Sequence, residues 1–520
     1  MLRGIETNST SATLFWTGNP LVDVGIATLC AMAKRSAPEQ LTLDDLDVAA
    51  REMEEYYFSG LLGSFLTCVF MNSEYVQPGE GEKKERTREA YSKRVLFAHR
   101  SVPDAGADGL VCAFSGLPAT HLIHRGQMPL LTGEDVLNCY PSGRGTLPVA
   151  GQFLTALQAL PLGGRRSEGK LLIGHSDKGE VTIELARKYL DDNRRLFQLS
   201  KAGQLPQKDG PDPALTREQG AWDTQKKRAK YPDAKAAPSL ISFDLTQIRA
   251  LQRETLRNEP VSVTVYWLSS SGQGPSLLVY HLPSNMIRFL VMAATAQTHA
   301  QWNGIVSKGW QRIGGEETPA QGAAQPTRKK AKVQKQTVDG GPGRSRNNVL
   351  ADLFQIYESG IVDLRAAKRF LRRHLLSDLK GSIQSPGDCN WILTELFLRE
   401  VFGMEQQRID AIRSFADGLA EHIKARNDKK LFKTIVRAER AYEFRNALTK
   451  AQRNEADANN RLLFGFEDYL AVFEADDSIG RLDWSLVRDL ISIRLVEQLH
   501  KSGFLSKDML EDEESQQPAA

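Results

Sequence analysis

Residues 314–346, GGEETPAQGAAQPTRKKAKVQKQTVDGGPGRSR, divide the 520-residue chain into two parts of different character. The stretch is rich in Gly, Pro and Gln, holds almost no large apolar residue, and carries the basic cluster RKKAK at residues 328–332. A segment of this composition has little apolar surface to bury, so we interpret it as a flexible linker. We therefore expect an N-terminal region over residues 1–313, a second domain over 347–502, and an acidic, disordered tail over 503–520.

The segment 347–502 has the hydrophobic pattern of a helical domain. Its apolar residues recur with the 3.6-residue period of an α-helix, Gly and Pro are few, and no stretch alternates like a strand. This pattern predicts an all-α helical bundle. Its helices are expected near residues 347–358, 362–377, 390–402, 405–426, 429–450, 466–475 and 483–501.

Residues 1–313 mix helical and strand patterns. The segment 261–267 (VSVTVYW) alternates with period 2, turns through a Ser/Gly-rich stretch and returns at 276–281, which predicts a β-hairpin. A short strand is expected at 170–174, and helices are expected near residues 22–34, 44–58, 152–160 and 180–200. The sequence thus predicts the α+β class, with a mixed α/β N-terminal region followed by an all-α helical-bundle C-terminal domain.

The charge balance excludes a uniformly basic nucleic-acid binder, because 67 Lys and Arg residues stand against 64 Asp and Glu residues. The five cysteines are an odd, widely spread set, which argues against a disulfide framework and favours a reducing cytoplasm. The first residues lack the apolar core of a signal peptide, and no apolar stretch is long enough to span a bilayer. We expect a cytoplasmic protein with no membrane partner.

The sequence lacks the motifs of several common catalytic devices, namely a phosphate-binding loop, an HExxH zinc motif and a GxSxG nucleophile turn. We therefore expect no catalytic residue, no cofactor and no enzymatic activity. One alternative is a zinc-dependent nucleic-acid-processing enzyme that uses Cys112, His121, His124 and Cys139. Their spacing matches no common zinc module, and a buried free cysteine beside ordinary histidines explains the same residues, so we predict no metal site.

Two basic helix faces stand out in the second domain. The first carries Arg365, Lys368, Arg369, Arg372 and Arg373 at offsets that share one face of a helix, while Leu364, Leu371 and Leu375 are expected to face the bundle. The second includes Lys430, Lys433 and Arg437. Like charges one helical turn apart cost helix stability, so such faces indicate an anionic partner, and the backbone of a nucleic acid is the partner we expect.

Three stretches of the N-terminal region together resemble a known family. They are FWTGNPLVDVG at residues 15–25, CAFSG at 112–116 and LPVAGQFLTALQALPLG at 147–163. They are similar to the large subunit of type I-B CRISPR effector complexes (Cascade), in the family named for its two CxxC motifs. Of the four cysteines that the family pattern implies, this chain keeps Cys112 and has Ser115, Ala150 and Phe153 at the other positions. A single thiolate does not hold zinc, so we expect packing around Phe153 to replace the metal.

The resemblance implies a subunit without catalysis of its own, which binds the guide RNA and target double-stranded DNA and assembles with CRISPR backbone and small subunits. Its N-terminal part would read the short protospacer-adjacent motif and support R-loop formation, and its helical part would line the path of the non-target strand. The complex would recruit a helicase-nuclease or, if it is coupled to another system, transposition proteins. Motif-reading candidates in Gly-flanked loops are Arg144, Arg165, Arg166 and Gln273, for which a plain turn is the alternative interpretation.

Overall fold

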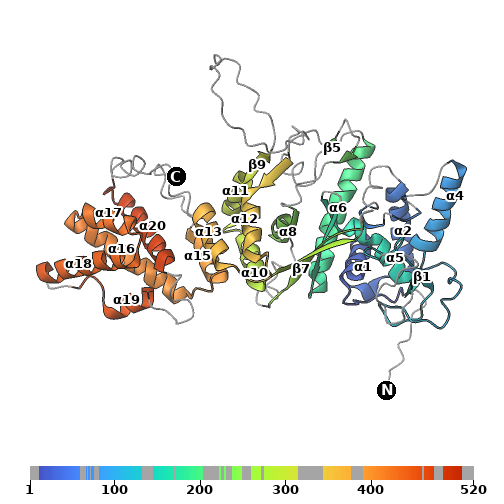
Figure 1. Ribbon diagram of the computed structural model, residues 1–520, viewed down its shortest axis with the longest axis horizontal. Coiled ribbons are helices and arrows are strands. Elements are labelled where there is room, and N and C mark those ends of the chain that lie inside the picture. Colours follow the sequence, from blue (N-terminus) through green and yellow to red (C-terminus); the bar gives the residue numbers. More distant parts are fainter. Residues whose placement is uncertain are drawn as a thin grey trace, which may run out of the picture. The chain divides into compact units, whose positions relative to one another are not determined.

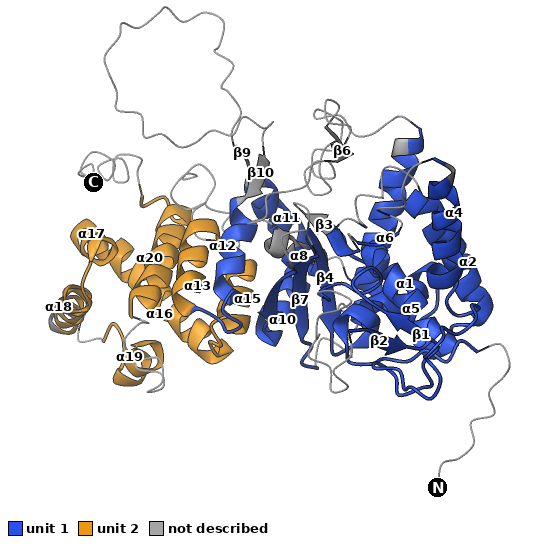
Figure 2. Ribbon diagram, turned by 45° about the vertical axis from the view of Figure 1, so that its right-hand side comes forward, with its two compact units in different colours: residues 1–363 blue, residues 364–520 orange. Residues whose placement is uncertain are grey.

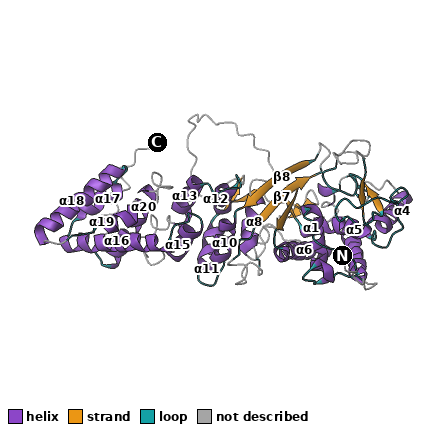
Figure 3. Ribbon diagram, turned by 90° about the horizontal axis from the view of Figure 1, so that it is seen from below, coloured by secondary structure: helices purple, strands orange, loops and turns teal. Residues whose placement is uncertain are grey.

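The computed structural model divides the chain into two compact units, Met1–Asp363 and Leu364–Ala520 (Figure 2). Strands occur in the first unit, and the described part of the second unit is helical (Figure 3), so the predicted α+β class is confirmed. No helix in the described ranges is long and apolar enough to cross a membrane. The structure describes residues 11–58, 66, 68–70, 72–74, 76, 81–131, 145–167, 170–202, 222–223, 228–229, 237–246, 248, 259–270, 275–313, 344–375, 391–459, 462–473 and 484–505.

Helix α1 (Pro20–Ala33) is the centre of the N-terminal core, since most of its side chains are buried. It packs against α6 (Gly179–Lys201), α5 (Gly151–Ala159) and α2 (Leu43–Phe58) (Figure 1). The bounds of these four helices lie within two residues of the predicted ranges. The shorter helical elements around them are η1 (Pro38–Gln40), α4 (Glu82–Tyr91), η2 (Ser92–Leu96) and η3 (Leu160–Gly163).

The stretch 15–25 builds the entry to α1. The Asn19 side chain accepts hydrogen bonds from the backbone N–H groups of Leu21 and Val22, at 3.0 and 3.4 Å, and so caps the helix. The buried Asp23 carboxylate accepts from the backbone N–H of Thr17 at 2.8 Å, which fastens the preceding loop to the first turn. The first four backbone N–H groups of a helix have no acceptor within the helix, and Asn19 supplies an acceptor for two of them in α1.

The main sheet has four antiparallel strands in the order β3–β4–β7–β8. The predicted hairpin is confirmed, because β7 (Val263–Ser269) pairs with β8 (Ser276–Leu282). The predicted strand at 170–174 is confirmed as β4 (Lys170–Ser176), and β3 (Arg165–Ser167) pairs with it. Three two-stranded ladders complete the described strands: β1 (His121–Ile123) with β2 (Leu147–Val149), β5 (Trp222–Asp223) with β6 (Arg228–Ala229), and β9 (Trp310–Ile313) with β10 (Arg344–Asn347).

Helix α12 (Asn348–Tyr357) belongs to the first unit, whereas the sequence assigned it to the bundle over 347–502. Its Phe354 ring meets Tyr280 of β8 edge-on, with centroids 4.9 Å apart, and the Tyr357 hydroxyl is hydrogen-bonded to Ser242. Helical periodicity shows that a face is apolar but not which element covers it. The remaining helices here are α8 (Ala237–Thr246), α10 (Ser284–Ala293) and α11 (His299–Lys308), and residues 314–343 of the predicted linker lie outside the described residues.

The second unit packs around α16 and α20. Arg494 of α20 donates from Nε and Nη2 to the two carboxylate oxygens of Asp417 on α16, at 2.7 and 2.9 Å. Most of the predicted acidic tail, residues 506–520, lies outside the described residues. The elements of this unit are α13 (Leu364–Phe370), η5 (Leu371–Leu375), α15 (Trp391–Glu400), α16 (Gln406–Arg426), α17 (Lys429–Arg437), α18 (Ala441–Asn459), α19 (Phe466–Phe473) and α20 (Trp484–Lys501).

Candidate nucleic-acid interface

Helix α17 has the sequence KKLFKTIVR, and its two faces differ sharply in polarity. Leu431, Phe432 and Ile435 are buried against the bundle. The side chain of Asp428 accepts the backbone N–H of Leu431 at 2.8 Å and caps the first turn. Because the apolar residues fix the inner face, the Lys and Arg side chains must lie on the outer one.

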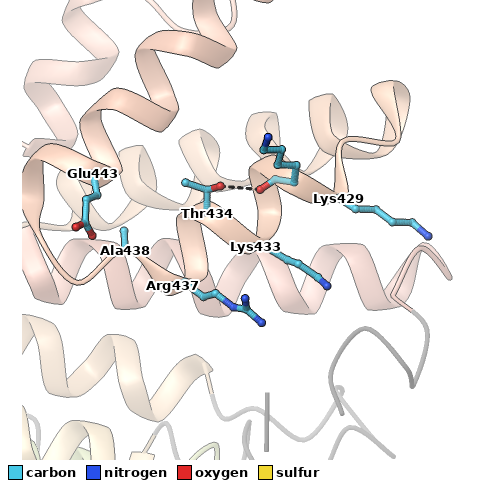
Figure 4. Close-up of a pocket in the computed structure, with 7 residues that line it drawn as sticks. Lys429, Lys433, Thr434, Arg437, Ala438 and Glu443 are labelled. Carbon is cyan, nitrogen blue, oxygen red and sulfur yellow. Dashed lines mark hydrogen bonds between the residues drawn. The ribbon is translucent and has the colours of Figure 1, made fainter. Parts of the chain in front are cut away.

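An open groove of about 530 Å³ runs along that outer face. Four of the residues that line it are cationic, and Figure 4 shows Lys429, Lys433 and Arg437 projecting on the same side of the helix. Lys429, Lys430 and Arg437 are exposed and form no ion pair with another described residue. Uncompensated positive charge in a concave surface favours an anionic ligand. The lining residues are Lys429, Lys430, Lys433, Thr434, Arg437, Ala438 and Glu443.

The groove ends where the sequence predicted a continuous helix. The helix expected over 429–450 is two helices, α17 and α18, which separate at residues 438–440, so that prediction was wrong. The carboxylate of Glu443 accepts the backbone N–H groups of Glu439 and Arg440, at 3.0 and 3.3 Å, and so stabilises the start of α18. These hydrogen bonds, led by the one from Arg440, hold the pKa of Glu443 below its ordinary value.

The first predicted basic face, residues 365–373, is interrupted by a change of helix type. Arg365, Lys368 and Arg369 lie on α13, whereas Arg372 and Arg373 lie on the π-helical turn η5. A π turn widens the helix from the i→i+4 to the i→i+5 hydrogen-bonding pattern, so the five cations do not form the straight row that α-helical spacing predicts. The four arginines are exposed, and Lys368 is half-buried.

The apolar side of the same segment follows the prediction only in part. Leu371 and Leu375 are buried, as expected. Leu364 was expected to face the bundle, but its side chain is 36% exposed, so this assignment was wrong. Leu364 is the first residue of α13, where no preceding turn of the helix covers it.

A chain of hydrogen bonds links the two basic segments through α20. Arg372 donates from Nε to Asp489 at 2.6 Å, and Arg488 donates from Nε to the other oxygen of Asp489 at 3.0 Å. Arg488 also donates from Nη1 to the backbone carbonyl of Ala438, which lines the groove. These hydrogen bonds therefore connect segments that lie about 65 residues apart in sequence. Residues of α20 make this connection, and the spacing of cations within either segment does not predict it.

Arg165, proposed as a motif reader in an exposed loop, has a different role. It lies on β3 with only 9% of its surface exposed, and Nη1 forms an ion pair with Asp244 at 3.0 Å. Lys188 approaches the other Asp244 oxygen at 3.3 Å. Burial raises the pKa of Asp244, but Lys188 and Arg165 outweigh it and lower the pKa overall. A buried arginine in such a pair is not available to a DNA base edge, so this assignment was wrong.

The other three motif-reading candidates cannot be placed in an interface. Arg166 is part of β3, and its side chain is not among those the structure describes. Arg144 and Gln273 lie outside the described residues. They stay predictions of the sequence.

The two histidines of the alternative zinc set form hydrogen bonds within the N-terminal unit. Both ring nitrogens of His121 have partners, Ser101 Oγ at 2.6 Å and Thr120 Oγ1 at 2.8 Å, and burial lowers the pKa of this imidazole. His124 accepts the backbone N–H of Gly126 through Nδ1 at 3.2 Å. No group of three metal-binding side chains occurs among the described residues, and Cys139 lies outside them.

The two segments that resemble CxxC motifs meet in the N-terminal core. The backbone N–H of Ala113 donates to the carbonyl of Pro148 at 2.9 Å, so the loop after Cys112 lies against β2. Phe153 is fully buried, and its ring meets Phe15 edge-on with centroids 5.5 Å apart. Cys112 is buried in the same core. Cys112, Ala150 and Phe153, three of the four positions that the resemblance assigns to metal ligands, are thus buried members of one hydrophobic core.

No protein-family profile, curated protein sequence or solved structure matches this chain.

Proposed function

We propose that this chain is a non-catalytic, nucleic-acid-binding subunit of a CRISPR RNA-guided DNA surveillance complex, similar to the type I-B large subunit. The observation that carries the proposal is the groove on α17, which four cationic residues line. Polyanion backbones bind such surfaces by releasing condensed counterions, without reading sequence. The resemblance of residues 15–25, 112–116 and 147–163 supplies the more specific assignment to a CRISPR complex.

In this proposal the chain acts in the cytoplasm, where its helical unit holds the DNA strand displaced by the guide RNA. Base pairing between guide and target supplies sequence specificity, and the groove supplies affinity that is independent of sequence. The N-terminal unit contacts the guide RNA and the protospacer-adjacent motif. A helicase-nuclease, or transposition proteins in a coupled system, would supply the chemistry.

The test of the groove is a triple neutralisation, K429Q/K430Q/R437Q, in the full-length chain. Binding of fluorescent DNA is measured by anisotropy between 50 and 200 mM salt. Loss of three phosphate contacts reduces the slope of log K against log salt by about 2–3, because each contact contributes about 0.7 on single strands and 0.9 on duplex. The variant K83Q/K84Q/K93Q changes the net charge equally on α4 and η2, outside the groove, and serves as the control.

An unchanged slope in the groove variant would refute the role of the groove. The assignment to a CRISPR complex has its own test, which is co-expression with backbone subunits and a guide RNA encoded beside a repeat array. Isolation of a stoichiometric complex that contains the RNA supports the assignment. Failure of the chain to join an otherwise assembled RNA complex overturns it.

A further inference from the structure

Glu443 is the one acidic residue among the seven that line the α17 groove. It stands at the end of the groove where α18 begins, and Figure 4 shows its side chain separated from the row formed by Lys429, Lys433 and Arg437. Its position is fixed, because the carboxylate accepts two backbone N–H groups, at 3.0 Å from Glu439 and 3.3 Å from Arg440. A negative charge is therefore built into the wall of a cationic groove.

This carboxylate opposes an incoming phosphate in two ways. It repels the phosphate directly across an open site, as any like charge does. It also occupies N–H groups at the N-terminus of α18, where the positive end of the helix dipole would otherwise attract an anion. The low pKa of Glu443 keeps the group ionised at neutral pH.

We propose that Glu443 limits the affinity of the groove for nucleic-acid phosphates, so that the contact stays weak enough to release and re-form. The inference rests on the proposed function of the groove. A surface that follows a strand during its displacement must exchange one phosphate for the next, and a fully cationic groove would hold its ligand too long. Glu443 thus tunes the strength of the contact in addition to capping α18.

The decisive variant is E443Q, because the glutamine carbonyl can accept the same two backbone N–H groups while the charge is lost. We expect about three- to tenfold tighter binding of a fluorescent single-stranded oligonucleotide at 50 mM salt, and a steeper salt dependence. E443A removes the cap as well as the charge, and it should also bind more tightly. The control E439Q changes the net charge equally at a residue that does not line the groove, and it should leave affinity within about twofold.

The outcomes separate this inference from the proposed function. If K429Q/K430Q/R437Q binds like the parent chain, the groove is not the binding site and its role in the proposed function is refuted. If that variant loses affinity while E443Q and E443A bind no more tightly than the parent, the groove stands and the role of Glu443 is overturned. Equal tightening by E439Q and E443Q would also overturn it, since net charge alone would then explain the gain. Thermal unfolding of each variant establishes that it is folded, and either Glu443 variant that folds decides the question.

Discussion

The substitution Gly25→Ala tests the packing of α1 against α5, on which the N-terminal core depends. A Cβ atom at position 25 would lie 2.1 Å from the carbonyl oxygen of Ala156 and 2.7 Å from its carbonyl carbon. Both atoms belong to the backbone of α5, so no side chain can rotate to relieve the overlap. The two helices must move apart, and the contacts around the buried residues Val22 and Ile26 loosen with them.

The size of the effect follows from two opposing contributions. Overpacking of a core costs about 1–3 kcal/mol, and an overlap with backbone atoms places this substitution near the upper limit. The higher helix propensity of alanine relative to glycine stabilises the folded state by about 1 kcal/mol and offsets part of this cost. The net loss is about 2 kcal/mol in the free energy of unfolding. For a unit that spans residues 1–363 this lowers Tm by roughly 2–3 °C, because the entropy of unfolding is about 2 cal/mol/K per residue.

Differential scanning calorimetry of the full chain measures the change in the transition of the N-terminal unit. The matched control is Gly304→Ala within α11 of the same unit, where no atom lies within 4 Å of the added Cβ. There the helix propensity acts without steric opposition, so stability should rise by up to about 1 kcal/mol. If Gly25→Ala melts at or above the temperature of Gly304→Ala, the close crossing of α1 and α5 is refuted.

Two further predictions concern stability. Phe153→Ala should lower the free energy of unfolding by about 3–5 kcal/mol in chemical denaturation, because the ring is fully buried, and Phe153→Leu should lower it by less than half as much. Small and equal losses for the two variants would contradict the packing described for this position. The other prediction concerns Asp104. Burial raises the pKa of this carboxyl group, but hydrogen bonds from Arg94 and from the backbone N–H of Leu122 lower the pKa overall. The ionised carboxylate therefore stabilises the protein above the unfolded-state pKa of about 3.9, and this stabilisation is lost as pH falls through the lower folded-state pKa. Asp104→Asn should therefore destabilise the protein at pH 7 in urea unfolding and differ progressively less from the parent below about pH 4; a constant difference across that range would contradict the pKa shift.

Sequence patterns predicted those parts of the fold that short-range contacts determine. The hairpin was found because strand alternation and its turn lie within about twenty residues. Pairing of β4 with β7 was not foreseen, because it joins strands almost a hundred residues apart, for example Ile173 with Tyr266. The residue pattern within one strand does not indicate which distant strand pairs with it.

The candidate site was predicted to a similar degree. Spacing identified Lys430, Lys433 and Arg437 as a basic face, and these three residues line the groove. The helix break that closes the groove was missed, since residues 438–440 (AER) contain neither Gly nor Pro. The available signal was Glu443, at the position from which an acidic side chain reaches back to cap a helix start, but its usual Ser or Thr partner is absent. The π turn at η5 was missed as well, because the spacing of the cations is the same as in a regular α-helix.

Whether a predicted cation can meet a nucleic acid depends on carboxylates that lie far away in the sequence. Arg165 lost its proposed role because Asp244, 79 residues later, holds it in the core. Arg372 is paired with Asp489, 117 residues later, and its side chain is nonetheless 46% exposed. Helical spacing places a cation on a face, but tertiary structure decides whether that face also receives a partner. In the described part of the second unit, the α17 groove keeps three exposed cations that no carboxylate pairs. Because this charge is uncompensated, we propose the nucleic-acid contact there rather than along the longer row on α13 and η5.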